Sequence, residues 1–171
     1  MATAVRIPVE LYLRTSSYEP DAEFVAGEIR KRPMGTLNHA DWQQAIQRWF
    51  ANHGREWEIR AYPELRVNTL PQHYRVPDVV ILDTARPIEQ IVSYPPLAVF
   101  EIVSPCDPWS EVTEKAREYT TMGIPQVWIV DPDKGIFWRY MDNGICASQT
   151  FEISERGIRF DWKELRSLLQ Q

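Results

Sequence analysis

The sequence predicts an α/β fold, and three observations carry this prediction. Two nearly continuous apolar runs, 76–83 and 97–104, are rich in β-branched residues, as expected for strands buried on both faces. A segment with helical signals begins at Asp107 and is followed by a third apolar run, 126–131. Because strand, helix and strand in this order form a βαβ unit, we expect 97–103 and 126–131 to be parallel in one sheet.

Length and composition favour one globular domain over residues 1–171. The chain has 171 residues, 44% of them hydrophobic and 25% charged, and domains hold on the order of 150 residues. No apolar stretch is long enough to span a membrane, and the N-terminus lacks a secretory pattern. The two cysteines, Cys106 and Cys146, are too few for a disulfide framework. A cytoplasmic protein with reduced thiols is therefore expected.

The first half predicts short strands around one helix. Residues 21–29 suggest a turn into a short strand or a helix start, and a break is expected at 33–35. A helix follows with Asn38 as its N-cap, and it ends before Gly54. One apolar face of this helix is formed by residues at three- and four-residue spacing: Trp42, Ala45, Ile46, Trp49 and Phe50.

The second half predicts more strands and two helices. Residues 57–67 alternate as one or two strands. In the helix after 104, we expect Asp107 as N-cap, Pro108 at the first helical position and Gly123 just past the end. The strand 126–131 then turns into 136–140. The tail predicts strands near 151–153 and 158–160 and a short helix over 162–169.

Charge is distributed unevenly along the chain. The net charge is −5, which argues against a protein that coats nucleic acid by bulk attraction. Residues 30–75 hold eight basic and four acidic side chains, whereas 76–133 hold ten acidic and three basic ones. A basic surface beside an acidic locus suits a metal-dependent enzyme that acts on a polyanion. A solvated acidic helix explains the same counts.

Several familiar sites are absent from the sequence. The seven glycines form neither a dinucleotide-binding motif nor a P-loop. His39, His53 and His73 lack zinc-protease spacing, and Ser104 lies in no nucleophile elbow. Nucleotide binding through those motifs is excluded, and the interpretations as a zinc hydrolase or a serine hydrolase are weakened.

Two carboxylates stand where folding alone does not favour them. Glu101 lies inside the apolar run 97–103, and an uncompensated buried charge costs several kcal/mol by order of magnitude. Asp78 opens the other apolar run, after Pro77. If the two strands are neighbours, a Mg²⁺ or Mn²⁺ ion between the carboxylates would compensate both. The alternative is that Glu101 pairs with an arginine and Asp78 caps a turn.

Lys115 is the basic residue placed to join these acids. On a helical projection it lies at the border of the apolar stripe formed by Trp109, Val112, Ala116 and Tyr119. There it could orient a water or offset charge on a phosphoryl transition state. The alternative is an i,i+4 pair with Glu111.

These motifs resemble a known family. P-D-V-V at 77–80, E-I-V-S-P at 101–105, the segment 107–119 and G-I-P-Q-V-W-I-V-D-P at 123–132 are similar to the Uma family of restriction endonucleases, within the PD-(D/E)XK nuclease superfamily. E-F-V-A-G-E-I at 23–29 and the helix led by His39 extend the resemblance, which covers a core of about residues 18–169.

The resemblance implies a restriction-endonuclease-like core with a mixed central β-sheet flanked by helices. It implies that Asp78, Glu101 and the Ile102 carbonyl hold Mg²⁺ or Mn²⁺. The superfamily places a lysine two residues after the glutamate, where this chain has Val103, so we expect Lys115 to replace it. Glu28 is the expected additional acid near the metal, and His39 a weaker candidate.

Two functions follow as hypotheses. The first is a metal-dependent endonuclease that hydrolyses DNA phosphodiester bonds, with a homodimer as one way to reach both strands. The second is a catalytically degenerate nuclease-fold module that binds DNA or protein. Basic residues near the first helix are candidate phosphate contacts: Arg30, Lys31, Arg32 and His39, with Arg48, Arg55, Arg60 and Arg66 further along the chain.

Overall fold

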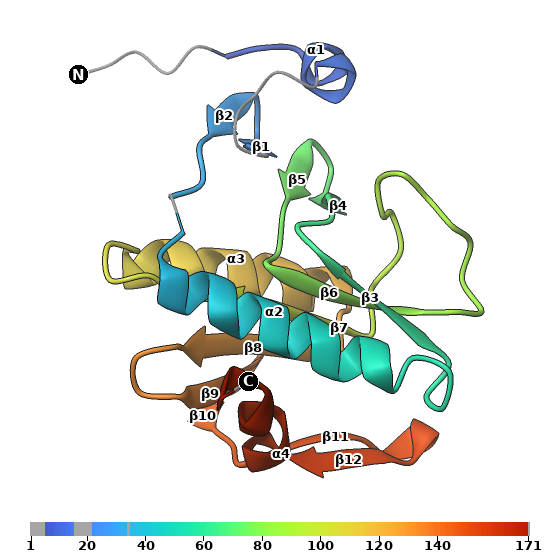
Figure 1. Cartoon of the computed structure of the whole chain (residues 1–171). Coiled ribbons are helices and arrows are strands. Elements are labelled where there is room, and N and C mark those ends of the chain that lie inside the picture. Colours follow the sequence, from blue (N-terminus) through green and yellow to red (C-terminus); the bar gives the residue numbers. More distant parts are fainter. Residues whose placement is uncertain (1–5, 16–21, 34, 171) are drawn as a thin grey trace.

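A computed structural model describes residues 6–15, 22–33 and 35–170 and contains a mixed central sheet. Residues 18–21, where the core was expected to begin, and Met34 in the expected break lie outside this description. The central sheet has six strands in the order β10-β9-β8-β7-β6-β3 (Figure 1). Its strands are β3 (Ile59–Pro63), β6 (Val79–Asp83), β7 (Ala98–Ile102), β8 (Gln126–Asp131), β9 (Ile136–Met141) and β10 (Gly144–Ala147).

The predicted βαβ unit forms the middle of this sheet. β7 and β8 are parallel, with Glu101 opposite Ile129, and α3 (Trp109–Met122) connects them. β6 lies antiparallel on the other side of β7, with Val79 opposite Phe100. All residues of β7 and β8 are buried, which explains their nearly continuous apolar sequence. The prediction of a mixed α/β sheet is confirmed.

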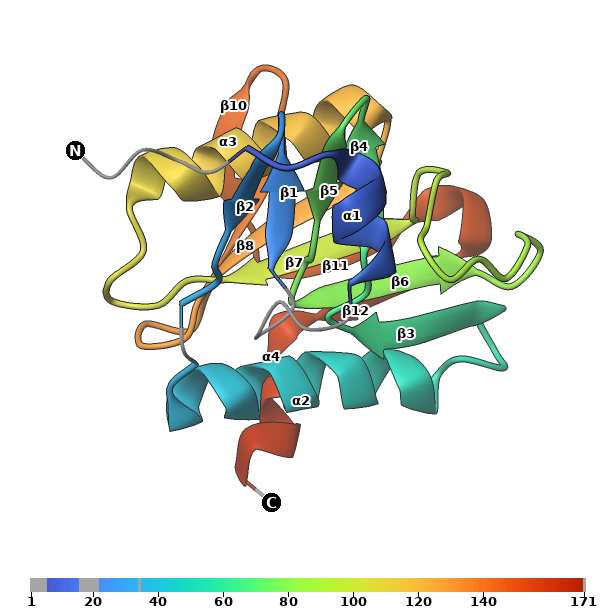
Figure 2. The same cartoon turned by 90° about the horizontal axis from the view of Figure 1, so that it is seen from above.

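Helices cover both faces of the sheet (Figure 2). One face packs against α2 (Leu37–Asn52) and the C-terminal elements through Phe50, Phe100, Trp128 and Trp162. The other face packs against α3 through Val80, Val99, Val112, Tyr119 and Val127. Successive residues of β7 contribute to opposite cores, because side chains alternate across a strand.

A second sheet, here called the small sheet, lies over the α3 side of the six-stranded central sheet, the large sheet. Its four antiparallel strands have the order β2-β1-β5-β4, and α1 (Val9–Arg14) packs on it by stacking Tyr12 against Phe24. The strands are β1 (Glu23–Val25), β2 (Glu28–Arg30), β4 (Val67–Leu70) and β5 (His73–Arg75). This sheet joins the start of the chain to its middle, because β1 pairs with β5.

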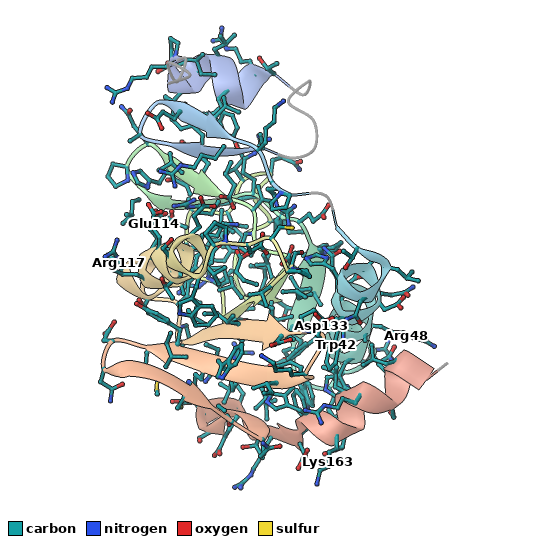
Figure 3. The ribbon with its side chains drawn as sticks, turned by 90° about the vertical axis from the view of Figure 1, so that its left-hand side faces the viewer. Trp42, Arg48, Glu114, Arg117, Asp133 and Lys163 are labelled. Carbon is teal, nitrogen blue, oxygen red and sulfur yellow. The ribbon has the colours of Figure 1, made fainter. Side chains whose placement is uncertain are left out.

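The start of α2 differs from the sequence prediction. The N-cap is Thr36, whose side chain accepts a hydrogen bond from the His39 amide at 3.2 Å. Asn38, the predicted cap, is already helical, and its side chain donates to Asp133 at 2.8 Å. Both are good capping residues, so local sequence favours either, and the contact with the β8–β9 turn engages Asn38. Figure 3 shows Trp42 and Asp133 close together at this junction.

The start of α3 also corrects the prediction. Pro108 is the N-cap, and Asp107 instead accepts a hydrogen bond from the Ser104 amide at 2.7 Å. Gly123 ends the helix in the left-handed conformation at φ 97°, as predicted. Trp109 was expected in the buried stripe but is 48% exposed, and its ring packs edge-to-face with that of Trp138 on β9.

The C-terminal segment closes the α2 face. β11 (Thr150–Ile153) and β12 (Ile158–Asp161) form a hairpin that is joined by the 3-10 turn η1 (Ser154–Arg156). The predicted final helix is split into α4 (Trp162–Arg166) and a 3-10 turn, η2 (Ser167–Gln170). Among the described helices, none has the length and apolarity needed to cross a bilayer.

Candidate active site

The two carboxylates singled out in the sequence meet at one end of the central sheet. Asp78 directly precedes β6, and Glu101 lies in β7. In this antiparallel pair Val79 lies opposite Phe100. Asp78, the residue before Val79, therefore lies opposite Glu101. Both side chains are buried, at 3% and 7% exposure, and both line one cleft of about 370 Å³.

Asp78 is surrounded by hydrogen-bond donors. Its Oδ2 accepts from the Ile102 amide at 2.7 Å and faces His39 Nε2 at 3.3 Å. Its Oδ1 contacts the Arg32 guanidinium. Burial alone would raise the pKa of Asp78, but the His39 hydrogen bond and the Arg32 charge outweigh it and lower that pKa. Asp78 is therefore held as a carboxylate.

Glu101 has weaker compensation. Its Oε1 accepts a 2.6 Å hydrogen bond from the Tyr119 hydroxyl, and its Oε2 lies 3.4 Å from Lys115 Nζ. Burial raises the pKa of Glu101 to about 7, against the lowering effect of Lys115, and the charges of Asp78 and Glu23 add to the rise. Within the described part of the chain, the partners of Glu101 are Lys115 and Tyr119 and include no arginine, whereas Arg32 pairs with Asp78.

Lys115 lies between two acids. Its Nζ is 3.0 Å from Glu23 Oε1 and 3.4 Å from Glu101 Oε2. Although burial lowers the pKa of Lys115, the charges of Glu101 and Glu23 raise it above the ordinary value. Val103 lines the same cleft. The structure thus brings Lys115 to the glutamate, as expected, and its role in catalysis stays a prediction.

Glu23 is the site residue that sequence reasoning missed. It lies in β1, is 2% exposed and lines the cleft, whereas Glu28, the acid chosen from the sequence, lies on β2 and is not among the lining residues. The sequence contains a signal for Glu23, because this acid lies between the apolar residues Ala22 and Phe24. Glu101 was identified from the same kind of apolar surroundings. A buried acid next to apolar residues identifies the inward face of a strand.

A buried ionic chain fixes Glu23 from behind. Arg75 is 1% exposed and donates to Glu23 at 3.0 Å and to Glu118 at 2.9 Å. Glu118 also accepts from Thr69 and faces His73. Burial would raise the pKa of Glu118, but its hydrogen bond and charge interaction with Arg75 lower it. The chain links β1, β5 and α3 behind the cleft.

The four predicted phosphate contacts have different surroundings. Arg30 pairs with Glu114 at 3.2 Å, and Figure 3 shows Glu114 on the side of α3 that faces the small sheet, with Arg117 pointing outward. Lys31 is exposed and lines the cleft. Arg32 and His39 also line it, but both contact Asp78. Lys31 is therefore the most open of the four.

The donor set fits a hard divalent cation. Asp78 and Glu101 offer carboxylate oxygens, and Ile102, whose carbonyl was predicted as a ligand, lines the same cleft. Mg²⁺ is commonly held by one or two carboxylates and several waters. Within the residues that the structure describes, no group of three or more His, Cys, Asp or Glu side chains is arranged to hold a metal.

The chain is similar to proteins of known structure. The fold resembles the crystal structure of "a putative nuclease belonging to DUF820 from Anabaena variabilis ATCC 29413", with a TM-score of 0.80 and 22% identity over 95% of this chain and 99% of that chain. A second match, the "DrdV-DNA complex", has a TM-score of 0.40 and 13% identity over 73% of this chain and 10% of that chain. A search of curated proteins finds no match.

The family model is decisive because it spans most of the chain. It matches residues 9–161 and is described as "Putative restriction endonuclease". Those residues include both carboxylates, Lys115 and the whole central sheet. The chain belongs to the Uma2 family.

Proposed function

We propose that the protein is a metal-dependent nuclease that hydrolyses phosphodiester bonds in DNA. The observation that carries this proposal is the meeting of Asp78 and Glu101, from adjacent central strands, with Lys115 in one cleft. Membership of a restriction endonuclease family supports the reaction class. Two buried acids and a lysine in a cleft are costly for folding and useful for phosphoryl transfer.

Asp78, Glu101 and the Ile102 carbonyl would hold Mg²⁺ or Mn²⁺. When bound, such an ion lowers the pKa of a water and stabilises charge on the phosphoryl group. Glu101, with a pKa of about 7 in the free protein, would be the acid whose ionisation completes the ligand set. Tyr119 donates to Glu101 Oε1 and leaves Oε2 toward Lys115 and the cleft.

Lys115 provides fixed positive charge beside the reacting phosphate. Glu23 and Glu101 hold its Nζ in place, and Arg75 holds Glu23 in turn. A cation fixed before the reaction stabilises the negative charge that builds on phosphoryl oxygens without reorganisation. Lys31 and Arg30, at the rim, would contact neighbouring phosphates.

The test is cleavage of supercoiled plasmid with Mg²⁺ or Mn²⁺. We expect nicking or cutting by the wild-type protein and none above background by Asp78→Asn or Glu101→Gln. Asp142→Asn, in the exposed β9–β10 turn, is the matched control and should cleave as wild type does. Cleavage that survives both site substitutions would contradict the proposal.

A second candidate function is a nuclease-fold module that binds DNA or protein without cleaving. The contact of Arg32 with Asp78 and the presence of Val103 in the cleft favour it. Calorimetry separates the two: a degenerate module takes up no Mg²⁺ or Mn²⁺ at millimolar concentration, whereas the enzyme does.

A further inference from the structure

Arg32 contacts the Asp78 carboxylate inside the cleft, at the oxygen that neither Ile102 nor His39 engages. Its guanidinium contacts Oδ1, while Oδ2 is engaged by the Ile102 amide and His39. The Arg32 side chain is 11% exposed and lines the cleft. Because Ile102 and His39 belong to β7 and α2, the carboxylate itself is fixed, and Arg32 is the partner that can leave.

A guanidinium and a divalent cation cannot share this position. Two like charges a few ångströms apart in a buried site repel each other strongly, by several kcal/mol at an effective dielectric constant of about 20. An ion bound at Oδ1 would also compete with Arg32 for the same carboxylate oxygen. Ion binding therefore requires the guanidinium to move away from Oδ1.

A second acceptor for Arg32 lies at the rim of the cleft. Its other terminal nitrogen is 3.4 Å from Glu64 Oε1, and the Glu64 side chain is 43% exposed. The Glu64 amide donates to the Asp78 carbonyl at 3.2 Å, so the rim acceptor is tied to the same strand as the metal ligand. A short movement toward Glu64 would release Oδ1 and turn the guanidinium toward the opening of the cleft.

Once released, Arg32 has the chemistry of a phosphate contact. Its planar fork of N–H donors matches two oxygens of a phosphodiester. Arg30 and Lys31, on the same segment, also line the cleft. The displaced guanidinium would therefore lie beside the nucleic-acid backbone that enters it.

From this geometry we infer that Arg32 competes with the divalent ion for Asp78 and, when displaced, binds a phosphate of the nucleic acid. The inference rests on the proposed function and adds to it that metal and nucleic acid bind cooperatively. Each ligand favours the state in which Arg32 has left Asp78, so each should raise the affinity of the other by the same factor.

Two binding measurements test this role without activity. Calorimetry at pH 8 measures Mn²⁺ binding in the absence of DNA, and fluorescence anisotropy in Ca²⁺ measures binding of a labelled DNA duplex. For Arg32→Gln we expect Mn²⁺ to bind about tenfold more tightly, a change of about 1.4 kcal/mol, and the duplex to bind more weakly. Arg159→Gln, an exposed change on β12 with the same loss of charge, should alter neither constant beyond twofold.

For Arg32→Gln, the two affinities are expected to change in opposite directions, and this pattern identifies the competition between Arg32 and the metal ion. A purely structural role predicts that both affinities fall together, and that result, or an unchanged Mn²⁺ affinity, overturns the inference. If Arg32→Gln does not fold, Arg32→Lys replaces it: the retained cation should keep Mn²⁺ affinity within threefold while duplex binding weakens, and any other pattern counts against the inference.

The same data distinguish this inference from the proposed function. A wild-type protein that binds no Mn²⁺ at millimolar concentration contradicts both. A wild-type protein that binds Mn²⁺ and loses it on Asp78→Asn, but is unaffected by Arg32→Gln, leaves the nuclease proposal standing and rejects the role of Arg32 alone.

Discussion

Two buried carboxylates that lie opposite each other at the end of neighbouring strands have pKa values shifted in opposite directions. The pKa of Asp78 is lowered because His39, Arg32 and the Ile102 amide together outweigh burial. The pKa of Glu101 is raised to about 7 because burial outweighs Lys115 and Tyr119. Environments that separate two acids in this way are typical of sites where one group is always charged and the other changes charge near neutral pH.

Lys115 gives the sharpest prediction at this scale. Lys115→Gln should lower the rate of plasmid cleavage by about 10²–10³, the usual effect of removing one preorganised group from a charge-stabilising site. Single-turnover cleavage at saturating Mn²⁺ measures this change. Lys134→Gln, a change at a side chain that is 70% exposed, is the control and should cleave normally. A rate for Lys115→Gln within twofold of wild type would show that the lysine only neutralises Glu23 and Glu101.

The sequence reveals those site residues that break a local pattern. Glu101 was found because a charge interrupts an apolar strand, and Lys115 because helical geometry places it at the border of a buried stripe. Arg32 was assigned to a phosphate-binding surface, since nothing local indicates that its side chain turns inward to Asp78. Such a contact joins residues 46 positions apart, and it depends on how the small sheet meets the large one.

At the scale of elements, the first turn of α2 connects stability to the site. The Thr36 cap fixes the turn from which His39 reaches Asp78. Thr36→Ala should lower the free energy of unfolding by about 1 kcal/mol, as measured by urea denaturation, whereas Thr36→Ser should stay close to wild type. A Thr36→Ala variant with the same free energy of unfolding as wild type would contradict the assignment of Thr36 as the cap.

Glu118 joins α3 to the small sheet and predicts a pH dependence. Its folded pKa lies below the ordinary 4.5, so its carboxylate contributes stability above about pH 4.5, and that contribution is lost as the pH falls through the folded value. Glu118→Gln should therefore cost about 2 kcal/mol at pH 7, and the difference from wild type should shrink below pH 4.5.

The measurement for Glu118 is chemical denaturation in metal-free buffer from pH 3 to pH 8. Glu155→Gln, an exposed substitution in η1, should follow the wild-type curve throughout. A difference between Glu118→Gln and wild type that does not vary with pH would mean that packing, and not charge, accounts for the loss.

The long apolar strands could be predicted from the sequence, whereas the small sheet could not. β6, β7 and β8 are buried on both faces and therefore carry a continuous apolar signal. β1, β2 and β5 have three residues each, which is too short for a period to be recognised. Their pairing depends on contacts between Phe24 and Tyr74, fifty positions apart.

For the whole molecule, the two sheets should unfold together. The ionic chain from Glu23 through Arg75 to Glu118 crosses from the small sheet to α3, which packs on the large sheet. We expect a single urea transition in which tryptophan fluorescence and far-ultraviolet circular dichroism coincide. Two separated transitions would instead divide the chain into independent units and contradict the single-domain prediction.

The site residues are also spread over more than half of the chain. Its side chains come from β1, the segment before α2, the start of β6, β7 and α3, from Glu23 to Tyr119. During synthesis on a ribosome, therefore, a growing polypeptide could not assemble the cleft before α3 emerges. The buried acids, the lysine and the tyrosine of the site would therefore come together only after residues up to Tyr119 have been made.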